Sequence, residues 1–591
     1  MINYQNKKFK IIRFKTLAIC LFFSLIFSCN ITFPAVAKAD NPIRKIWSGW
    51  LPYYGIAKGV PSTLNNLDLT SEISPFWYTY TNNQNIKDLY SSANPNLPVA
   101  STIAQLKSNG LKLLPTLTDG MSKNAMANLI ANPSLQSNLI NQISNLVSAN
   151  QFDGIELDFE NFAFVDSLDS WTTTQPNWIN FIKNLSTSLH AANKLLAIDS
   201  PVQFDPTSGK KGYWVYSWKD IAPYIDRLRI MGYDYSVSKP GPIGPINWEE
   251  NSLKYAVTVI PASKIYLGIP GYGRNWITQI SGVCPSDVAT TVSTKAPAST
   301  FVQNGAQVLA SNLNANIVYD SATAEATFTY QKTYNGFTGN QSPTSCTVTG
   351  TAWFQNDQSF LARANLVSKY HLGGLAEWTL GFENSDTMNQ IRSFAASIAP
   401  DQVLALLTSN QDQVPWGVPI NLQAHFNLKD TTAVTGASTH LQRKDSLGNW
   451  QDISTGTSDN LGNISFDLIS ANSGSIRIIT DSTWDKAASV SKTFNFQVLP
   501  KINLSAPLSV PYQEQFSITG NAIPANVNEQ MQLYLNSRLI DKYNLTTSGL
   551  FSLMARAERK GINIYQVKVV DLNPNKKNQE ISSAELVVLV R

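Results

Sequence analysis

Cysteine is scarce in this sequence of 591 residues, and long apolar runs are almost absent. Only four cysteines occur, and two of them, Cys20 and Cys29, fall in the first forty residues. The remaining two, Cys284 and Cys346, can form one disulfide in an exported protein but are too few for a zinc site. Two buried free thiols are the alternative. No run of 18 apolar residues follows the first forty, so no membrane span is expected after them.

The first forty residues have the pattern of a secretory signal peptide. A basic start precedes the apolar run 17–28, and small-residue cleavage patterns follow at 35–39. Cleavage before Asp40 is expected, which makes 1–39 the signal peptide; an uncleaved anchor and a lipoprotein lipidated at Cys29 are the alternatives. Removing its six basic residues leaves 39 basic against 41 acidic residues, so nucleic acid is not an expected partner. We expect a secreted monomer, extracellular or in the cell wall.

The length predicts several domains, and residues 44–398 alternate short β-prone runs with longer helical ones. This alternation predicts an α/β fold, a (β/α)8 TIM barrel over 40–399, with an open doubly wound sheet as the competing fold. No glycine-rich phosphate loop follows the first strand, which disfavours that competitor. The eight predicted strands are Lys45–Pro52, Ile73–Tyr78, Leu111–Leu117, Gly154–Phe159, Leu195–Ile198, Leu228–Tyr233, Lys264–Ile269 and Gly374–Trp378.

Two further regions lie outside this alternation. The gap between the seventh and eighth strands is too long for one crossover, so a small α+β insertion is expected at about 277–350, with both remaining cysteines in it. After Pro400 short alternating runs and turn residues take over, which predicts a linker at 400–413 and two Ig-like β-sandwiches at 414–499 and 500–591. Trp416 and Trp450 could face a polysaccharide, but buried sandwich tryptophans are the favoured interpretation.

The segment Asp153-Gly-Ile-Glu-Leu-Asp-Phe-Glu160 carries four carboxylates in eight residues. In a strand, side chains alternate between faces, so Glu156, Asp158 and Glu160 share one side and the apolar residues between them share the other. Three like charges in a row require a bound proton or a partner for at least one of them. Such a cost is typical of sites built for proton transfer, with a charged edge or a metal-type cluster as the alternatives.

At the carboxyl end of a barrel strand these acids would lie where TIM-barrel chemistry occurs. Glu160, expected to end its strand, can protonate a leaving-group oxygen, and Asp158 can hydrogen-bond that acid or a substrate amide. Glycosidases usually place two carboxylates on opposite sides of the sugar, whereas these lie on one strand. That arrangement suits a substrate that supplies its own nucleophile, such as a 2-acetamido oxygen.

Four motifs in chain order resemble glycoside hydrolase family 18, the chitinase-type hydrolases. The octapeptide resembles the DxxDxDxE signature, and Met231-Gly-Tyr-Asp-Tyr235 is similar to the M-x-Y-D motif of the sixth strand. Lys264–Trp276 and Gly373–Trp378 resemble the seventh and eighth strands. Gly241–Trp248 and the continuation to Asn161 are closest to the branch of spore-cortex and cell-wall glucosaminidases. The resemblance covers 44–398 and leaves the sandwiches unexplained.

The resemblance implies a role for each matching residue. Glu160 would be the general acid/base, Asp158 would orient the acetamido group, and Tyr233, beside Asp234, would hydrogen-bond its carbonyl. Trp378 would stack under the sugar. The other expected substrate-binding residues are Asp153, Met231, Tyr53 and Trp248.

One position departs from the family pattern: Glu156 stands where family chitinases usually have aspartate. The resemblance implies a metal-free, cofactor-free, retaining hydrolase of β-1,4-linked N-acetylglucosamine polymers, chitin or peptidoglycan. A chitinase-like lectin or cell-wall adhesion protein with little turnover is the alternative.

Overall fold

The computed structural model of the protein describes residues 42–525, 529–571 and 580–591, so the expected signal peptide lies outside the described residues. Eight parallel strands form a closed barrel in the order β1-β15-β9-β8-β7-β6-β5-β2, with β1 paired back to β2. The predicted (β/α)8 barrel is therefore confirmed. The strands are β1 (Trp47–Pro52), β2 (Glu72–Thr81), β5 (Thr116–Gly120), β6 (Gly154–Asp158), β7 (Leu195–Pro201), β8 (Arg227–Met231), β9 (Ile265–Pro270) and β15 (Gly374–Trp378).

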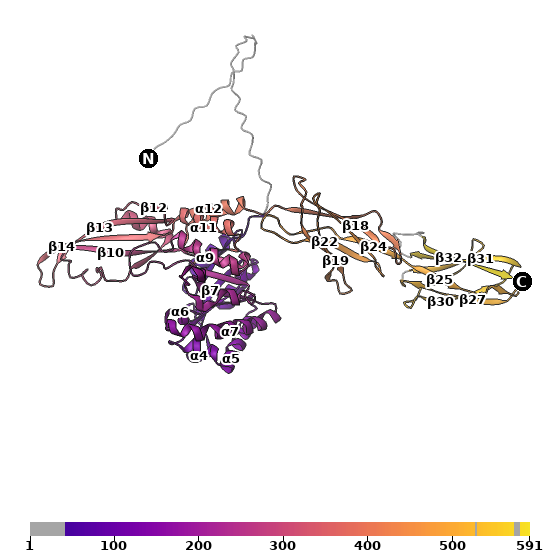
Figure 1. Ribbon diagram of the computed structural model, residues 1–591, viewed down its shortest axis with the longest axis horizontal. Coiled ribbons are helices and arrows are strands. Elements are labelled where there is room, and N and C mark those ends of the chain that lie inside the picture. Colours follow the sequence, from indigo (N-terminus) through magenta and orange to yellow (C-terminus); the bar gives the residue numbers. More distant parts are fainter. Residues whose placement is uncertain (1–41, 526–528, 572–579) are drawn as a thin grey trace, which may run out of the picture. The chain divides into compact units, whose positions relative to one another are not determined.

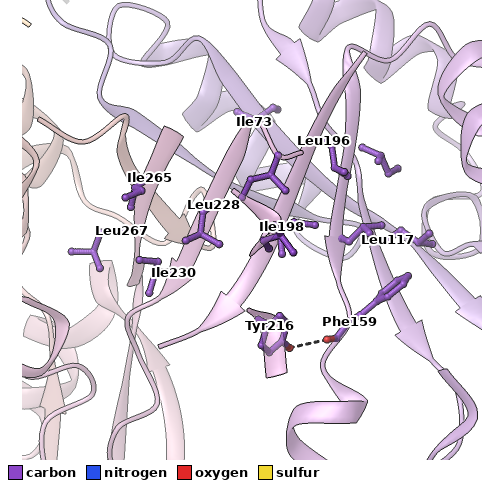
Figure 2. Packing of buried hydrophobic residues seen from close by; sticks show 14 of the residues in the cluster. Ile73, Leu117, Phe159, Leu196, Ile198, Tyr216, Leu228, Ile230, Ile265 and Leu267 are labelled. Atoms are coloured by element: carbon purple, nitrogen blue, oxygen red, sulfur yellow. Dashed lines mark hydrogen bonds between the residues drawn. The ribbon is translucent and has the colours of Figure 1, made fainter. Parts of the chain in front are cut away.

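Helices cover the outside of the barrel, and the apolar face of each strand packs against them. On β6 this face consists of Ile155 and Leu157, both fully buried, and Phe159 beyond the strand stacks on Phe181 of α7 with ring centroids 6.1 Å apart. Figure 2 shows the equivalent leucines and isoleucines of neighbouring strands. The main helices are α1 (Ile56–Asn65), α3 (Val99–Ser108), α5 (Pro133–Ala149), α7 (Trp171–Ala191), α9 (Ile246–Val259), α11 (Asp357–Tyr370) and α12 (Ser385–Ser397). Among the described residues, no helix has the length and apolar character needed to cross a membrane.

The third barrel strand differs from its prediction. The expected strand Leu111–Leu117 is split into β4 (Lys112–Leu113) and β5, which runs on to Gly120. Pro115 lies between them, and proline lacks the N–H that continues a strand ladder. The barrel strand therefore ends three residues later than predicted, which brings Asp119 to the mouth of the barrel.

The insertion between β9 and β15 is an antiparallel sheet, with strand order β11-β10-β14-β13-β12 and one short helix, α10 (Ala306–Asn312). Figure 1 shows its long strands β10 (Tyr272–Gly282), β13 (Glu325–Phe337) and β14 (Pro343–Phe354) running alongside one another. Cys284 and Cys346 are joined by a disulfide that closes a separation of 62 residues. The remaining strands are β11 (Ser299–Val302) and β12 (Val318–Asp320).

Beyond the barrel, two pairs of sheets each enclose an apolar core. The first pair spans β16 (Val403–Ser409) to β24 (Phe494–Leu499), and the second spans β25 (Lys501–Ser505) to β32 (Glu580–Val590). The expectation of a linker at 400–413 is corrected, because part of this stretch forms β16. This strand pairs with β18 (Ile420–Leu428) and buries Val403 and Leu407. Trp416 is 37% exposed, contrary to the favoured buried interpretation.

Candidate active site

The acidic segment lies on β6 and in the turn that follows it. Glu156 and Asp158 point into the barrel, because Ile155 and Leu157 occupy the outward positions. The prediction that Glu160 ends its strand is corrected: β6 ends at Asp158, and Glu160 is the N-cap of the short helix α6 (Asn161–Phe164). The three acids therefore do not form one continuous strand row. Glu160 projects instead from the turn above the strand end.

Glu156 is fully buried inside the barrel and is paired with a cation. Its carboxylate accepts hydrogen bonds from Arg229 Nε, from Ser74 Oγ at 2.7 Å and from Thr116 Oγ1 at 3.0 Å. Arg229 is equally buried and also meets Glu72, at 3.3 Å. The sequence did not reveal Arg229 as the partner, because it lies 73 residues further on. The residue that departs from the family pattern is thus held in a neutralised interior pair.

Asp158 and Glu160 lie at the mouth and have no basic partner among the described residues. Burial, followed by the negative charge of Asp234, raises the pKa of Glu160 to about 7. Burial, followed by the charge of Glu160, raises the pKa of Asp158 well above its ordinary value. Asp158 Oδ1 is buried and has no hydrogen-bond partner within the described part of the chain. This pair can hold a proton near neutral pH and present a free acceptor to a ligand.

A second buried aspartate, Asp199 on β7, lies beside them. Burial and the charges of Glu156 and Asp158 raise the pKa of Asp199 well above its ordinary value. Its Oδ2 accepts a hydrogen bond from Trp50 Nε1 at 3.0 Å. Sequence reasoning missed Asp199, although its inward position next to the acidic segment follows from the strand pairing of β6 with β7.

An aromatic cluster lies next to these acids. Trp378, at the end of β15, has its ring centroid 5.9 Å from Trp50 and 4.9 Å from Phe76. Tyr233 meets Trp50 edge-on at 6.4 Å. A partly exposed aromatic face beside carboxylates is typical of sugar-binding sites, because the apolar face of a sugar stacks on a ring. The structure thus brings Trp378 and Tyr233 together, as expected from the sequence.

Asp234 extends the site toward the inserted sheet. Its Oδ1 accepts hydrogen bonds from Tyr272 Oη and from Arg274 Nη2, the latter at 2.6 Å, and its side chain remains 44% exposed. Both partners lie on β10, which directly follows β9 through Gly271. The insertion therefore supplies residues to the site, and Met231 ends β8 at the same mouth.

Of the other expected substrate-binding residues, Asp153 lies at the far end of the barrel, whereas Tyr53 and Trp248 follow the carboxyl ends of β1 and β8 in the chain. Asp153 precedes β6 at the opposite end of the barrel, where it pairs with Lys107 at 3.3 Å. Trp248 lies on α9, packs against Tyr235 at 5.3 Å and lines a hollow of about 590 Å³ together with it. Tyr53 follows β1 and packs edge-on against Tyr54 at 5.2 Å. The expectation that Asp153 binds substrate is corrected, because the five-residue strand β6 separates it from the mouth, where Asp158 and Glu160 lie.

Across residues 42–525, 529–571 and 580–591, no three His, Cys, Asp or Glu side chains are grouped so as to hold a metal ion. Two of the buried acids near the mouth accept hydrogen bonds from protein donors: Asp199 from Trp50, and Asp119 from the backbone N–H groups of Glu160 and Asn161.

Comparison with curated proteins finds bacterial glycosylases. YdhD of Bacillus subtilis (strain 168), whose name describes a sporulation-specific glycosylase, is 26% identical over 362 residues, covering 59% of this chain and 76% of YdhD. The cortical fragment-lytic enzyme of the same organism is 24% identical over 255 residues, covering 43% of this chain and 52% of that enzyme.

Comparison with solved structures finds a chitinase and a spore cortex-lytic enzyme. A chitinase from Chromobacterium violaceum ATCC 12472 has a TM-score of 0.47 at 22% identity, covering 60% of this chain and 99% of the chitinase. The spore cortex-lytic enzyme SleL of Bacillus megaterium QM B1551 has a TM-score of 0.47 at 20% identity, covering 59% and 74%. The model described as glycosyl hydrolases family 18 matches residues 50–383, more than half of the sequence. The chain therefore belongs to glycosyl hydrolases family 18.

Proposed function

We propose that this family 18 glycosidase is a secreted enzyme that cleaves β-1,4-linked N-acetylglucosamine polymers, chitin or peptidoglycan, with retention of configuration. One observation carries the proposal: Glu160, with a pKa of about 7, lies beside Asp158, whose buried Oδ1 has no hydrogen-bond partner among the described residues. An acid that holds its proton near neutral pH can protonate a leaving group, and a free acceptor beside it can hold an amide N–H.

In this mechanism the substrate supplies the nucleophile. The acetamido oxygen attacks C1 as the glycosidic C–O bond breaks, and Glu160 gives its proton to the departing oxygen. Asp158 accepts a hydrogen bond from the acetamido N–H and stabilises the positive charge that develops on the oxazolinium ring. The Glu160 carboxylate then takes a proton from the water that attacks C1, which reopens the ring with net retention.

The other residues bind and orient the sugar. Tyr233 can donate to the acetamido carbonyl, and Trp378 offers a ring face to the sugar in the site. The names of the relatives, glycosylase and cortical fragment-lytic enzyme, support a glycan substrate.

The test is turnover of a fluorogenic chitooligosaccharide by the wild type, by Glu160→Gln and by the matched surface variant Glu250→Gln, whose residue pairs with Lys369 on the outer helices. We expect Glu160→Gln to lose at least about 10²–10⁴-fold in kcat, because proton transfer is removed while the side chain keeps its shape. Glu250→Gln should stay within about twofold of the wild type.

Unchanged turnover in Glu160→Gln would contradict the assignment of the acid. Binding without release by the wild type would instead support a carbohydrate-binding protein. Product analysis on chitin oligomers and on peptidoglycan, side by side, separates the two substrates, and NMR of the first-formed anomer tests retention.

A further inference from the structure

The turn that carries Glu160 lies beyond the strand ladder. The register of β5 with β6 ends at the pair Thr118 and Asp158, and α6 begins at Asn161. The backbone N–H groups of Glu160 and Asn161 therefore need partners from outside the ladder, because buried backbone groups are rarely left unpaired. How this turn is held decides where the Glu160 side chain points.

Asp119, near the end of β5, supplies those partners. Its Oδ1 accepts a hydrogen bond from the N–H of Glu160 at 3.0 Å, and its Oδ2 accepts one from the N–H of Asn161 at 2.9 Å. In return, Asn161 Nδ2 donates to the carbonyls of Asp119 and Met121, both at 2.8 Å. We call these four hydrogen bonds the Asp119–Asn161 clasp. Asp119 is only 8% exposed, so water competes little with them.

The residue before Glu160 is held from another direction. Tyr216, from the short helix after β7, donates its hydroxyl to the carbonyl of Phe159 at 2.7 Å, the bond drawn in Figure 2. Tyr216 is fully buried and packs against Phe162 with ring centroids 5.1 Å apart. The peptide groups on both sides of the Glu160 Cα are thus hydrogen-bonded to buried groups.

We propose that Asp119 is a positioning residue for the reaction: through the clasp it fixes the backbone from which Glu160 delivers its proton. The inference rests on the proposed function, because that function makes Glu160 the acid. A displacement of about 1 Å in a reacting group can cost about 10²-fold in rate, so an anchor of the backbone can control turnover without touching the substrate.

Asp119 also contributes to the electrostatics of the mouth. Its negative charge is one of the charges that raise the pKa of Asp158, after burial and the charge of Glu160. Burial raises the pKa of Asp119 itself to about 7, although the N–H groups of the clasp oppose that rise. Replacing its carboxylate with an amide therefore changes the pH dependence of the site as well as its geometry.

A purely structural role is the competing explanation, and the chain offers a matched control. Asp166, two residues after α6, is 9% exposed and accepts a hydrogen bond from the N–H of Asn124 at 2.6 Å. Its side chain also tethers a loop near α6, but it does not bind the N–H groups of Glu160 or Asn161. A residue that only stabilises the fold would behave in the same way as Asp166.

The experiment compares Asp119→Asn and Asp166→Asn in the full chain, with kcat, KM, Tm and pH profiles measured on a fluorogenic chitooligosaccharide. An asparagine at 119 keeps one acceptor oxygen and turns an NH2 group toward the other N–H. We expect kcat to fall by about 10–100-fold with KM within about twofold, and the pH profile to shift downward. Asp166→Asn should lower Tm and leave kcat and the pH profile unchanged.

A kcat of Asp119→Asn within twofold of the wild type, or an equal loss in both variants, would overturn the proposal. If Asp119→Asn does not fold, Asn161→Ala takes its place, because it removes only the side-chain half of the clasp; an unchanged kcat there has the same meaning. A wild type that cleaves neither chitin oligomers nor peptidoglycan overturns the proposed function first, and the inference with it.

Discussion

The barrel holds two groups of buried carboxylates, one in its interior and one at its mouth. They differ in whether an arginine forms an ion pair with them. In the interior, Glu156 and Glu72 both contact Arg229. Burial raises the pKa of Glu72, but the charges of the arginines outweigh it and the pKa ends below its ordinary value. At the mouth, Asp158 and Glu160 have no such partner among the described residues, and both pKa values are raised. Between these two groups, the pKa is raised at the mouth, where no cation compensates the charge, and lowered at Glu72, where the arginines do.

The interior pair also explains how three neighbouring acids coexist. Arg229 neutralises Glu156, so the segment carries two uncompensated carboxyl groups at the mouth rather than three. Glu156 is bound in an ion pair with Arg229 in the barrel interior, whereas Asp158 and Glu160 at the mouth can exchange a proton.

The largest expected effect comes from breaking the interior group. Arg229→Met should lower the free energy of unfolding of the barrel by about 3–5 kcal/mol, because it leaves Glu156 buried without a cation, while Glu72 keeps Arg227. Urea unfolding followed by tryptophan fluorescence measures the change. The control is Arg227→Met: Arg227 also binds Glu72, but its side chain is 21% exposed, so water replaces it and the loss should be about 1 kcal/mol. Equal losses in the two variants would contradict the distinction.

The second effect is on the pH dependence of the mouth. Glu160 must be protonated to act as the acid, so kcat/KM should fall as the pH rises through about 7. The negative charge of Asp234 raises that pKa, so Asp234→Asn should lower it and move this limb to lower pH. The profile is measured from pH 4 to pH 9 on a chitooligosaccharide, a range of about two units or more on either side of the limb. A limb that stays in place in Asp234→Asn would show that another group controls it.

Much of this organisation follows from the sequence, because strand alternation is local. The eight barrel strands, the inward direction of Glu156 and Asp158, and the aromatic residue at the end of β15 could all be predicted from short patterns. The prediction that Glu160 ends the strand was wrong, since β6 ends at Asp158 and Glu160 lies in the turn that follows. Strand ends depend on pairing with neighbours, and the octapeptide does not contain that information.

The contacts between strands could not be predicted from the sequence. Arg229, Asp199 and Asp119 reach the acidic segment from β8, β7 and β5, and no spacing within the chain signals their approach. Asp119 was hidden for a second reason: Pro115 divides the third strand, and the true barrel strand runs three residues past its predicted end. Closure of the barrel, rather than local pattern, brings these residues together.

The smallest expected effect concerns Glu156, which stands where family chitinases usually have aspartate. In Glu156→Asp the carboxylate is one methylene shorter and loses optimal contact with Arg229 and Ser74, while Arg229 keeps Glu72. We expect the free energy of unfolding to fall by about 1–2 kcal/mol and kcat to change by less than about tenfold, because the proton still comes from Glu160. Urea unfolding measures the change in free energy, and chitooligosaccharide turnover measures the change in kcat. A loss of kcat as large as in Glu160→Gln would place Glu156 with the mouth rather than the interior.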